Sequence, residues 1–128
     1  MTDTRERFEI RFSPRIRWLL RGLGMSPRRT EVVLSSGELR VRAGALRVEI
    51  PTYCIASVTE AKAPWWLAGV HTDFRGRWIV NGAPGRMVRL DLSQPVRAKL
   101  ARFNVTIRRL DLALADNALF RERLAARL

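Results

Sequence analysis

Apolar and polar side chains alternate along much of this chain, and a period of two is typical of half-buried β-strands. The first such segment places Phe8, Ile10 and Phe12 on one face and charged side chains on the other. The pattern predicts strands over residues 6–12, 31–34, 38–42, 46–50, 55–60, 77–80, 87–92 and 105–114. We expect a bulge at residues 108–109 of the last strand. Most of the chain is therefore predicted to form β-sheet.

Short turns join several of these strands. Residues 35–37 and 43–45 are rich in Ser, Gly and Ala and separate consecutive strands, which predicts an antiparallel meander of hairpins. A further hairpin is predicted between the strands at 77–80 and 87–92. Residues 64–76 lack a clear period and contain two glycines, so they are predicted to form the longest loop.

Three segments favour helix instead. Residues 13–14, Ser and Pro, form a helix-start signal, and apolar residues then recur at helical spacing as far as Leu23. This predicts a short basic helix between the first two strands. A helical turn is expected over residues 95–102, and Asp116 is expected to cap a C-terminal helix that starts at Asn117. The apolar residues of that last helix lie four apart: Phe120, Leu124 and Leu128.

Together these elements predict one mainly β domain over residues 1–128. About seven short strands in meander order would form a small antiparallel barrel, or a pair of orthogonal sheets, closed by the C-terminal helix. The chain has 128 residues and is 47% hydrophobic, which suffices for one core without disulfides or metal.

Several short motifs are spread over most of the chain. They are Leu39-Arg40-Val41-Arg42, Ile50-Pro51, Ile55-Ala56-Ser57-Val58, Pro64-Trp65-Trp66 with Ala68-Gly69, and Asp116 before Leu119-Phe120. In these motifs the chain resembles small actinobacterial proteins with a bacterial pleckstrin-homology-like (PH-like) domain, and the resemblance implies a PH-like barrel. In eukaryotic PH domains the phosphoinositide site uses basic residues around the loop between the first two strands. The matching region here contains Arg15, Arg17, Arg21, Arg28 and Arg29.

The chain is strongly basic. Its net charge is +12, and all but Lys62 and Lys99 of the 24 basic side chains are Arg. Such a charge attracts phosphate-bearing partners, but a GC-rich genome also enriches Arg without selection for binding. On the predicted strands four outward arginines alternate with Glu38, Glu49 and Asp91, which predicts a partly neutralised face. These arginines are Arg40, Arg42, Arg47 and Arg89.

The residues that catalysis or metal binding requires are scarce. Cys54 and His71 are the only Cys and His in the sequence, so the sole conceivable catalytic triad is Cys54, His71 and Asp73. The residues around Cys54 do not resemble the sequence around a known catalytic nucleophile. One His and one Cys fall short of a zinc site. Residues 22–24 lack the third glycine of a dinucleotide-binding loop. We therefore expect no enzymatic activity, metal or cofactor.

Two segments are candidate contact surfaces. The predicted helix and its flank, residues 14–29, join an apolar face to Trp18 and five arginines, so this segment would either lie on an anionic membrane or cover one end of the barrel. Trp65 and Trp66 would point in opposite directions from an extended loop and leave one ring exposed, or both would cover the core from a curled loop. The candidate binding residues are Arg15, Arg17, Trp18, Arg21, Arg28, Arg29, Trp65 and Trp66.

The predicted function is binding without chemistry. The leading hypothesis is a cytoplasmic PH-like module that binds a protein partner or an acidic membrane surface, at which it would be peripheral. The alternative is a small β-barrel that binds nucleic acid through surface arginines. No signal peptide or transmembrane segment is evident in the sequence. An exposed strand edge or the terminal helix would serve a symmetric homodimer if one forms.

Overall fold

The computed structural model describes residues 5–10, 30–63, 69–72, 75–81 and 85–128. In these residues the strands pair into a single nine-stranded sheet, which is followed by one α-helix. The strands are β1 (Glu6–Phe8), β2 (Thr30–Leu34), β3 (Glu38–Ala43), β4 (Leu46–Pro51), β5 (Ile55–Ala63), β6 (Gly69–Thr72), β7 (Arg77–Asn81), β8 (Gly85–Leu100) and β9 (Phe103–Leu112). A 3-10 helix, η2 (Thr52–Cys54), joins β4 to β5, and the C-terminal helix is α2 (Asn117–Ala125).

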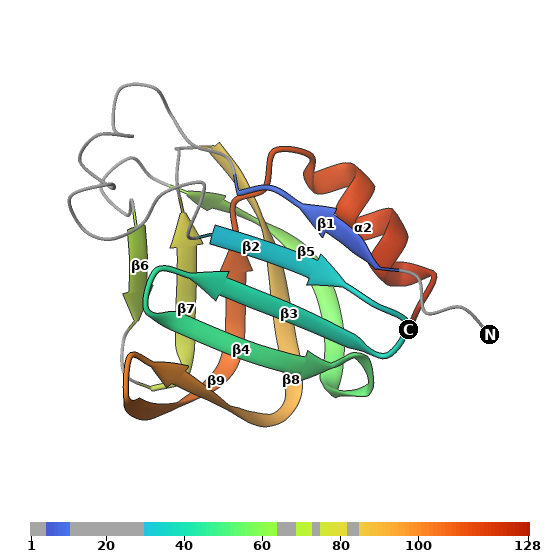
Figure 1. Ribbon diagram of the computed structural model, residues 1–128. Helices are drawn as coiled ribbons and strands as arrows, with labels where there is room; N and C mark the ends of the chain where they lie inside the picture. The colour runs from blue at the N-terminus through green and yellow to red at the C-terminus, as the bar shows by residue number, and fades with distance from the viewer. Residues whose placement is uncertain (1–4, 11–29, 64–68, 73–74, 82–84) are drawn as a thin grey trace.

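The sheet bends into two layers, and β8 belongs to both. Strands β1 to β4 lie side by side in front, while β5, β8, β9, β7 and β6 lie behind them (Figure 1). Among the described strands only β7 and β9 pair in parallel. The mainly β architecture with a C-terminal helix is thus confirmed, although the described strands outnumber those predicted.

The front layer has the predicted hairpins. Leu34 pairs with Leu39 across the first turn, and Ala43 pairs with Leu46 across the second. In the second turn Gly44 has a φ of 58°, a left-handed conformation that glycine adopts at little cost and that a two-residue hairpin turn requires. The two-residue period therefore predicted both the pairing and the buried face of these strands.

Strand β8 runs through a segment for which a helical turn was predicted, so the prediction for residues 95–102 is wrong. Ala98 and Lys99 pair with β4 on one side and with β9 on the other. Before them, residues 92–95 stand opposite Arg108 alone, a break in the register that tolerates a proline in a central strand. Pairing with a strand on each side therefore favours extended backbone over the predicted helical turn.

The rear layer differs from the prediction at β6 and β7. Strand β7 pairs with β6 and β9 but not with β8, so the hairpin predicted between residues 77–80 and 87–92 is wrong. Residues 69–72 form β6 where a loop was predicted, because pairing with β7 stabilises a segment too short to show a clear period. The irregularity predicted at residues 108–109 is present as a break in pairing at Arg108, but the additional residues lie in β8 and not in β9. On the other side of β9, the carbonyl of Gly76 accepts hydrogen bonds from the N–H groups of Arg108 (2.7 Å) and Arg109 (3.0 Å).

Helix α2 packs against the open side of the core, next to β1. The rings of Phe8 and Phe120 meet edge to face, with 4.9 Å between their centroids. The predicted cap is confirmed, since the carboxylate of Asp116 accepts a hydrogen bond from the N–H of Leu119 at 3.0 Å. Leu128 was predicted to face the core but is 59% exposed, because the helix ends at residue 125.

Ion pairs between β8 and β9 stabilise the rear layer. The carboxylate of Asp111 is buried and accepts hydrogen bonds from Nε and Nη2 of Arg89, each 3.1 Å long. These bonds raise the pKa of Arg89 above its ordinary value, against the opposing effect of burial. Arg109 and Asp91 form a second, reversed pair at 2.9 Å on the same two strands.

Replacement of Phe120 by Ala should lower the free energy of unfolding by about 3–5 kcal/mol, because it leaves a cavity beside Phe8. The matched control is Leu119→Ala on the same helix, where the side chain is 38% exposed and the loss should stay within about 1 kcal/mol. Urea unfolding followed by circular dichroism measures both values. Equal losses in the two variants would contradict the packing of α2 against β1.

Candidate functional site

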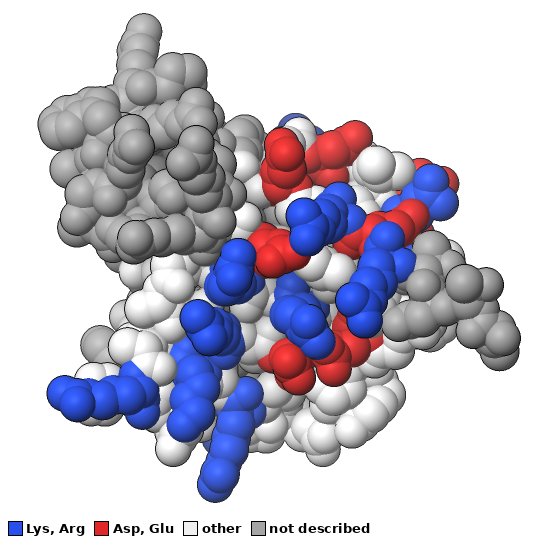
Figure 2. All heavy atoms as spheres, in the orientation of Figure 1, with Lys and Arg blue, Asp and Glu red and all other residues white. Residues whose placement is uncertain are grey.

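Most arginines on the outer surface of the front layer are paired with carboxylates. Arg40 lies 3.4 Å from both Glu38 and Glu49, and Arg42 lies 3.5 Å from Glu31. Exposed pairs of this kind add little stability, but they neutralise the surface around them. Figure 2 shows the resulting mixture of positive and negative side chains across this region. The partly neutralised face that the sequence predicted is confirmed here.

The same surface ends in a purely basic region. Arg47 on β4, Arg97 and Lys99 on β8, and Arg102 in the β8–β9 turn form no ion pair with any residue of the described ranges. These four residues are termed the basic end. In Figure 2 it lies at the lower left, where positive side chains are present without negative ones. The expectation of a neutralised face therefore fails at Arg47.

Strand register produces this concentration of charge. Arg42 stands opposite Arg47, Arg47 opposite Lys99, and Lys99 opposite Asn104. Directly opposite residues in an antiparallel pair have Cβ atoms roughly 4.5–5.5 Å apart, and like charges at that spacing destabilise the sheet. Glu31 compensates Arg42, whereas nothing in the described ranges compensates Arg47 and Lys99. The pair remains repulsive in the free protein.

Two tight turns border the basic end. The N–H of Ala101, in the β8–β9 turn, donates a 2.8 Å hydrogen bond to the carbonyl of Ala45 in the β3–β4 turn. Ala101 has a φ of 53°, a left-handed conformation that costs a residue other than glycine about 1–2 kcal/mol. Backbone strain of this kind is frequent at functional sites. The turns are thus fixed relative to one another beside the unpaired charges.

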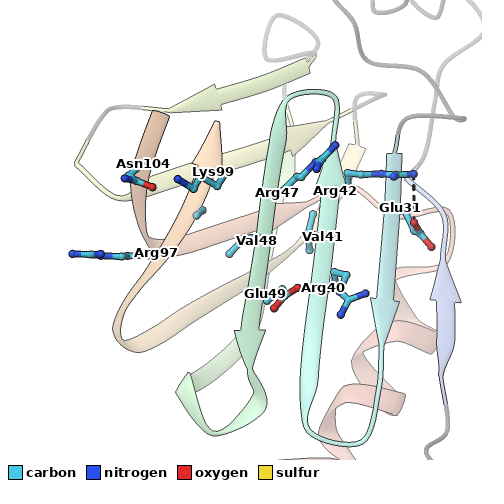
Figure 3. A pocket seen from close by; sticks show the side chains of 11 residues that line it. Glu31, Arg40, Val41, Arg42, Arg47, Val48, Glu49, Arg97, Lys99 and Asn104 are labelled. Carbon is cyan, nitrogen blue, oxygen red and sulfur yellow. Dashed lines mark ion pairs between the residues drawn. The ribbon is translucent and has the colours of Figure 1, made fainter. Parts of the chain in front are cut away.

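The surface is hollowed at two places near these residues. An open depression of about 770 Å³ lies over β3, β4 and β8. Figure 3 shows Arg42 at its edge pointing from β3 toward Glu31 on β2, while Arg97 extends away from the β3–β4 hairpin. A smaller hollow of about 490 Å³, termed the notch, lies between the two turns. The notch is lined by Gly44, Ala45, Arg47, Lys99, Ala101 and Arg102.

An exposed aromatic ring adjoins the notch. Phe103, the first residue of β9, is 62% exposed, and the guanidinium carbon of Arg102 lies 5.8 Å from the centroid of its ring. A single exposed apolar side chain is common on protein surfaces, so the exposure of this ring matters only because the ring lies beside unpaired cations. Tyr53 is exposed as well, but it belongs to η2 at the opposite end of β4. Phe103 is therefore the aromatic residue associated with the basic end.

The binding residues predicted from the sequence lie outside the described residues, as do Phe12 and the helix predicted to start at Pro14. These binding residues are Arg15, Arg17, Trp18, Arg21, Arg28, Arg29, Trp65 and Trp66.

The basic end was not predicted from the sequence. A helical turn was expected over residues 95–102, and it would have placed Arg97 and Lys99 on different sides of a helix. The alternation of Val96, Ala98 and Leu100 with these two cations was the signal that could have revealed the strand.

Cys54 does not have the environment of a nucleophile. It is buried on η2, its sulfur accepts a hydrogen bond from Nε2 of Gln94 at 3.1 Å, and its carbonyl accepts one from Ser93 at 3.2 Å. His71 lies on β6, the last strand of the pairing order. Asp73, the third residue of the conceivable triad, lies outside the described residues.

Comparison with protein-family models, curated proteins and solved structures gives no match. Among the helices that the structure describes, none is long and apolar enough to cross a membrane. In the same part of the chain, no group of three or more His, Cys, Asp or Glu residues could hold a metal ion. The function must therefore be inferred from the chemistry of the surface itself.

Lys99→Glu should stabilise the protein by about 0.5–1 kcal/mol, because it replaces a repulsive pair with Arg47 by an attractive one. Arg97→Glu is the control: it makes the same change of charge on the same strand, but opposite Thr106. Thermal unfolding at low and at high salt measures the stability of the two variants. The stabilisation by Lys99→Glu should become smaller at high salt, because salt screens the charges. An equal gain in the two variants would indicate an effect of net charge alone.

Proposed function

We propose that this protein is a non-enzymatic binding module that docks on an acidic membrane surface through the basic end and Phe103. The observation that carries the proposal is the contrast within one surface: unpaired cations gather beside an exposed aromatic ring, while the neighbouring arginines are paired. The proposal locates the module at the cytoplasmic face of a membrane, where anionic lipids are found.

Electrostatics supports this mode of binding. A Lys or Arg close to an anionic leaflet contributes about 1 kcal/mol, so four unpaired cations supply a moderate, salt-dependent attraction. Because the cations are concentrated at one end, the attraction also orients the molecule. Phe103 then meets the lipid interface at the tip of the β8–β9 hairpin, and burial of its ring adds an apolar contribution.

Nucleic acid is the less favoured ligand. Domains that bind single strands combine basic grooves with several aromatic rings on which successive bases stack. In the described residues Phe103 is the one exposed ring at the basic end. An acidic protein segment would use the same charges but would not require an exposed ring at a hairpin tip. Both become outcomes of the binding assay.

We further infer that the fold is a PH-like barrel. The order of elements supports this inference: an antiparallel meander, a second layer of strands, and a C-terminal helix that buries Phe120 and Leu124. On this view the predicted basic helix and the two tryptophans at 65–66 form a second contact region. Separate Trp65→Ala and Trp66→Ala variants in the assay below test that region independently of the basic end.

Sedimentation with anionic and neutral liposomes, alongside a gel shift with single- and double-stranded nucleic acid, tests the proposal. The protein should sediment with anionic vesicles only, and increasing salt should release it. An Arg97→Glu, Arg102→Glu variant should lose most of this binding, and Phe103→Ala should weaken it roughly tenfold through the loss of about 1.4 kcal/mol of apolar burial.

Matched controls separate these effects from general damage. Lys62→Glu, together with a second charge reversal at Arg108, makes the same change of net charge at two exposed cations outside the basic end. Tyr53→Ala removes an exposed ring from the other end of β4. Both controls should bind anionic vesicles nearly as the unaltered protein does. Binding to nucleic acid but not to vesicles, or equal losses in variants and controls, would refute the membrane proposal.

A further inference from the structure

The geometry points to the notch between the β3–β4 and β8–β9 turns as a site for a phosphomonoester, a phosphate group with one organic substituent. This inference deepens the proposed membrane function and rests on it, because a lipid with a terminal phosphate would present such a group at a membrane surface. Three cationic side chains line the notch: Arg47, Lys99 and Arg102.

The unpaired charges match the charge of this ligand. Arg47 and Lys99 face one another from adjacent strands, and the described residues that line the notch include no carboxylate, so two uncompensated positive charges share one small volume. A phosphomonoester carries about −1.5 to −2 charges near pH 7, whereas the phosphodiester of most anionic lipids carries about −1. A monoester can therefore compensate both cations at once, and a diester cannot.

The donors also suit a phosphate. The guanidinium groups of Arg47 and Arg102 can each donate two parallel hydrogen bonds to phosphate oxygens, and the ammonium group of Lys99 acts as a point charge between them. The other lining residues are Gly44, Ala45 and Ala101, whose small side chains leave room for a tetrahedral group. The volume of about 490 Å³ lies within the range of small-ligand sites.

The turn backbone holds the two sides of the site together. The N–H of Ala101 is bonded to the carbonyl of Ala45, so the two turns stay together although the cations beside them repel. This bond and the left-handed Ala101 fix the notch in the absence of a ligand. A preformed site of this kind loses less free energy to ordering on binding than a flexible one.

Phe103 indicates the source of the phosphate. The ring stands immediately beyond Arg102 at the rim of the basic end, and its exposed surface is apolar. Binding of a soluble phosphomonoester would gain nothing from an exposed apolar ring. Binding of a lipid headgroup in the notch, in contrast, brings the ring to the acyl boundary of the membrane. The phosphate therefore belongs to a lipid, and soluble monoesters serve as probes of the same site.

The notch predicts a distinctive response to pH. The second pKa of a phosphomonoester is about 6, so the ligand loses a charge on acidification. Among the residues that the structure describes, the charged groups that face the notch are Arg47 from β4, Lys99 from β8 and Arg102 from the turn. Glu31 and Glu49 line the adjoining depression and are paired with Arg42 and Arg40. Binding of a monoester should thus weaken below about pH 6 through the ligand alone.

The test measures binding of the full chain to phosphatidic acid vesicles and to phosphatidylglycerol vesicles of equal zeta potential, above and below the second phosphate pKa. At the higher pH the protein should bind phosphatidic acid about fivefold more tightly, the effect of one additional charge contact. Below that pKa the preference should disappear. The phosphatidylglycerol series controls for any effect of pH on the protein itself.

Two double variants locate the effect. Arg47→Gln with Lys99→Gln should abolish the preference for phosphatidic acid and leave weaker, equal binding to both vesicles. Arg97→Gln with Arg108→Gln removes the same charge outside the notch, so it should weaken binding to both vesicles and keep the preference. A thermal unfolding midpoint at or above that of the unaltered protein shows that the first variant is folded, because it removes a repulsion.

Glycerol 3-phosphate and inorganic phosphate, as soluble competitors, distinguish the source of the ligand. If either competitor releases the protein from phosphatidic acid vesicles, the notch binds soluble phosphate groups as well as the lipid. If the protein prefers phosphatidic acid but neither competitor releases it, the notch binds a phosphomonoester only at a membrane. Equal binding to the two vesicle types at equal zeta potential would overturn this inference and leave the membrane function intact. Failure to bind either vesicle would refute the membrane function itself.

Discussion

Strand β8 holds the two layers of this protein together. Its first half lies between β5 and β9 in the rear layer, and its last residues pair with β4 in the front layer. The break opposite Arg108 lets the strand change layers, and Ser93 and Gln94 at this break hydrogen-bond to Cys54 on η2. The pairing of Val48 with Ala98 buries both side chains, and the same register sets Arg47 directly opposite Lys99. Packing of the core thus forces two cations together on the outside.

That juxtaposition conflicts with the way the rest of the surface is arranged. Arg40, Arg42, Arg89 and Arg109 all have carboxylate partners, some exposed and one buried. A single Glu at position 99 would have extended this pattern to the basic end. Local violations of an otherwise consistent pattern are expected where a surface serves a function at the expense of stability. The unpaired cations are therefore more informative than the total charge, which the Arg-rich composition inflates.

The sequence was sufficient where the determinants of structure are local. The turn at Gly44 and the cap at Asp116 each depend on a few adjacent residues, and the structure confirms both. Two other features were not predicted by any local sequence pattern: the parallel pairing of β7 with β9 and the short strand β6. Both depend on pairing with another strand and not on adjacent residues. The helical turn predicted over residues 95–102 is a continuation of β8, and the basic end was missed because the alternation of Val96, Ala98 and Leu100 was not recognised as a strand pattern. The predicted arginines and tryptophans of residues 14–29 and 65–66 stay a prediction, since they lie outside the described residues.

Backbone amide chemical shifts would show whether the basic end is the surface that meets an anionic membrane, as we propose. The protein would be titrated with lipid nanodiscs that contain phosphatidic acid, and each amide would be followed by NMR. If the protein docks through the basic end, shifts and line broadening should be confined to the β3–β4 turn, the end of β8 and the first residues of β9, around Arg47, Lys99 and Phe103. Perturbation centred on α2 or β5, with these amides unchanged, would contradict this proposal.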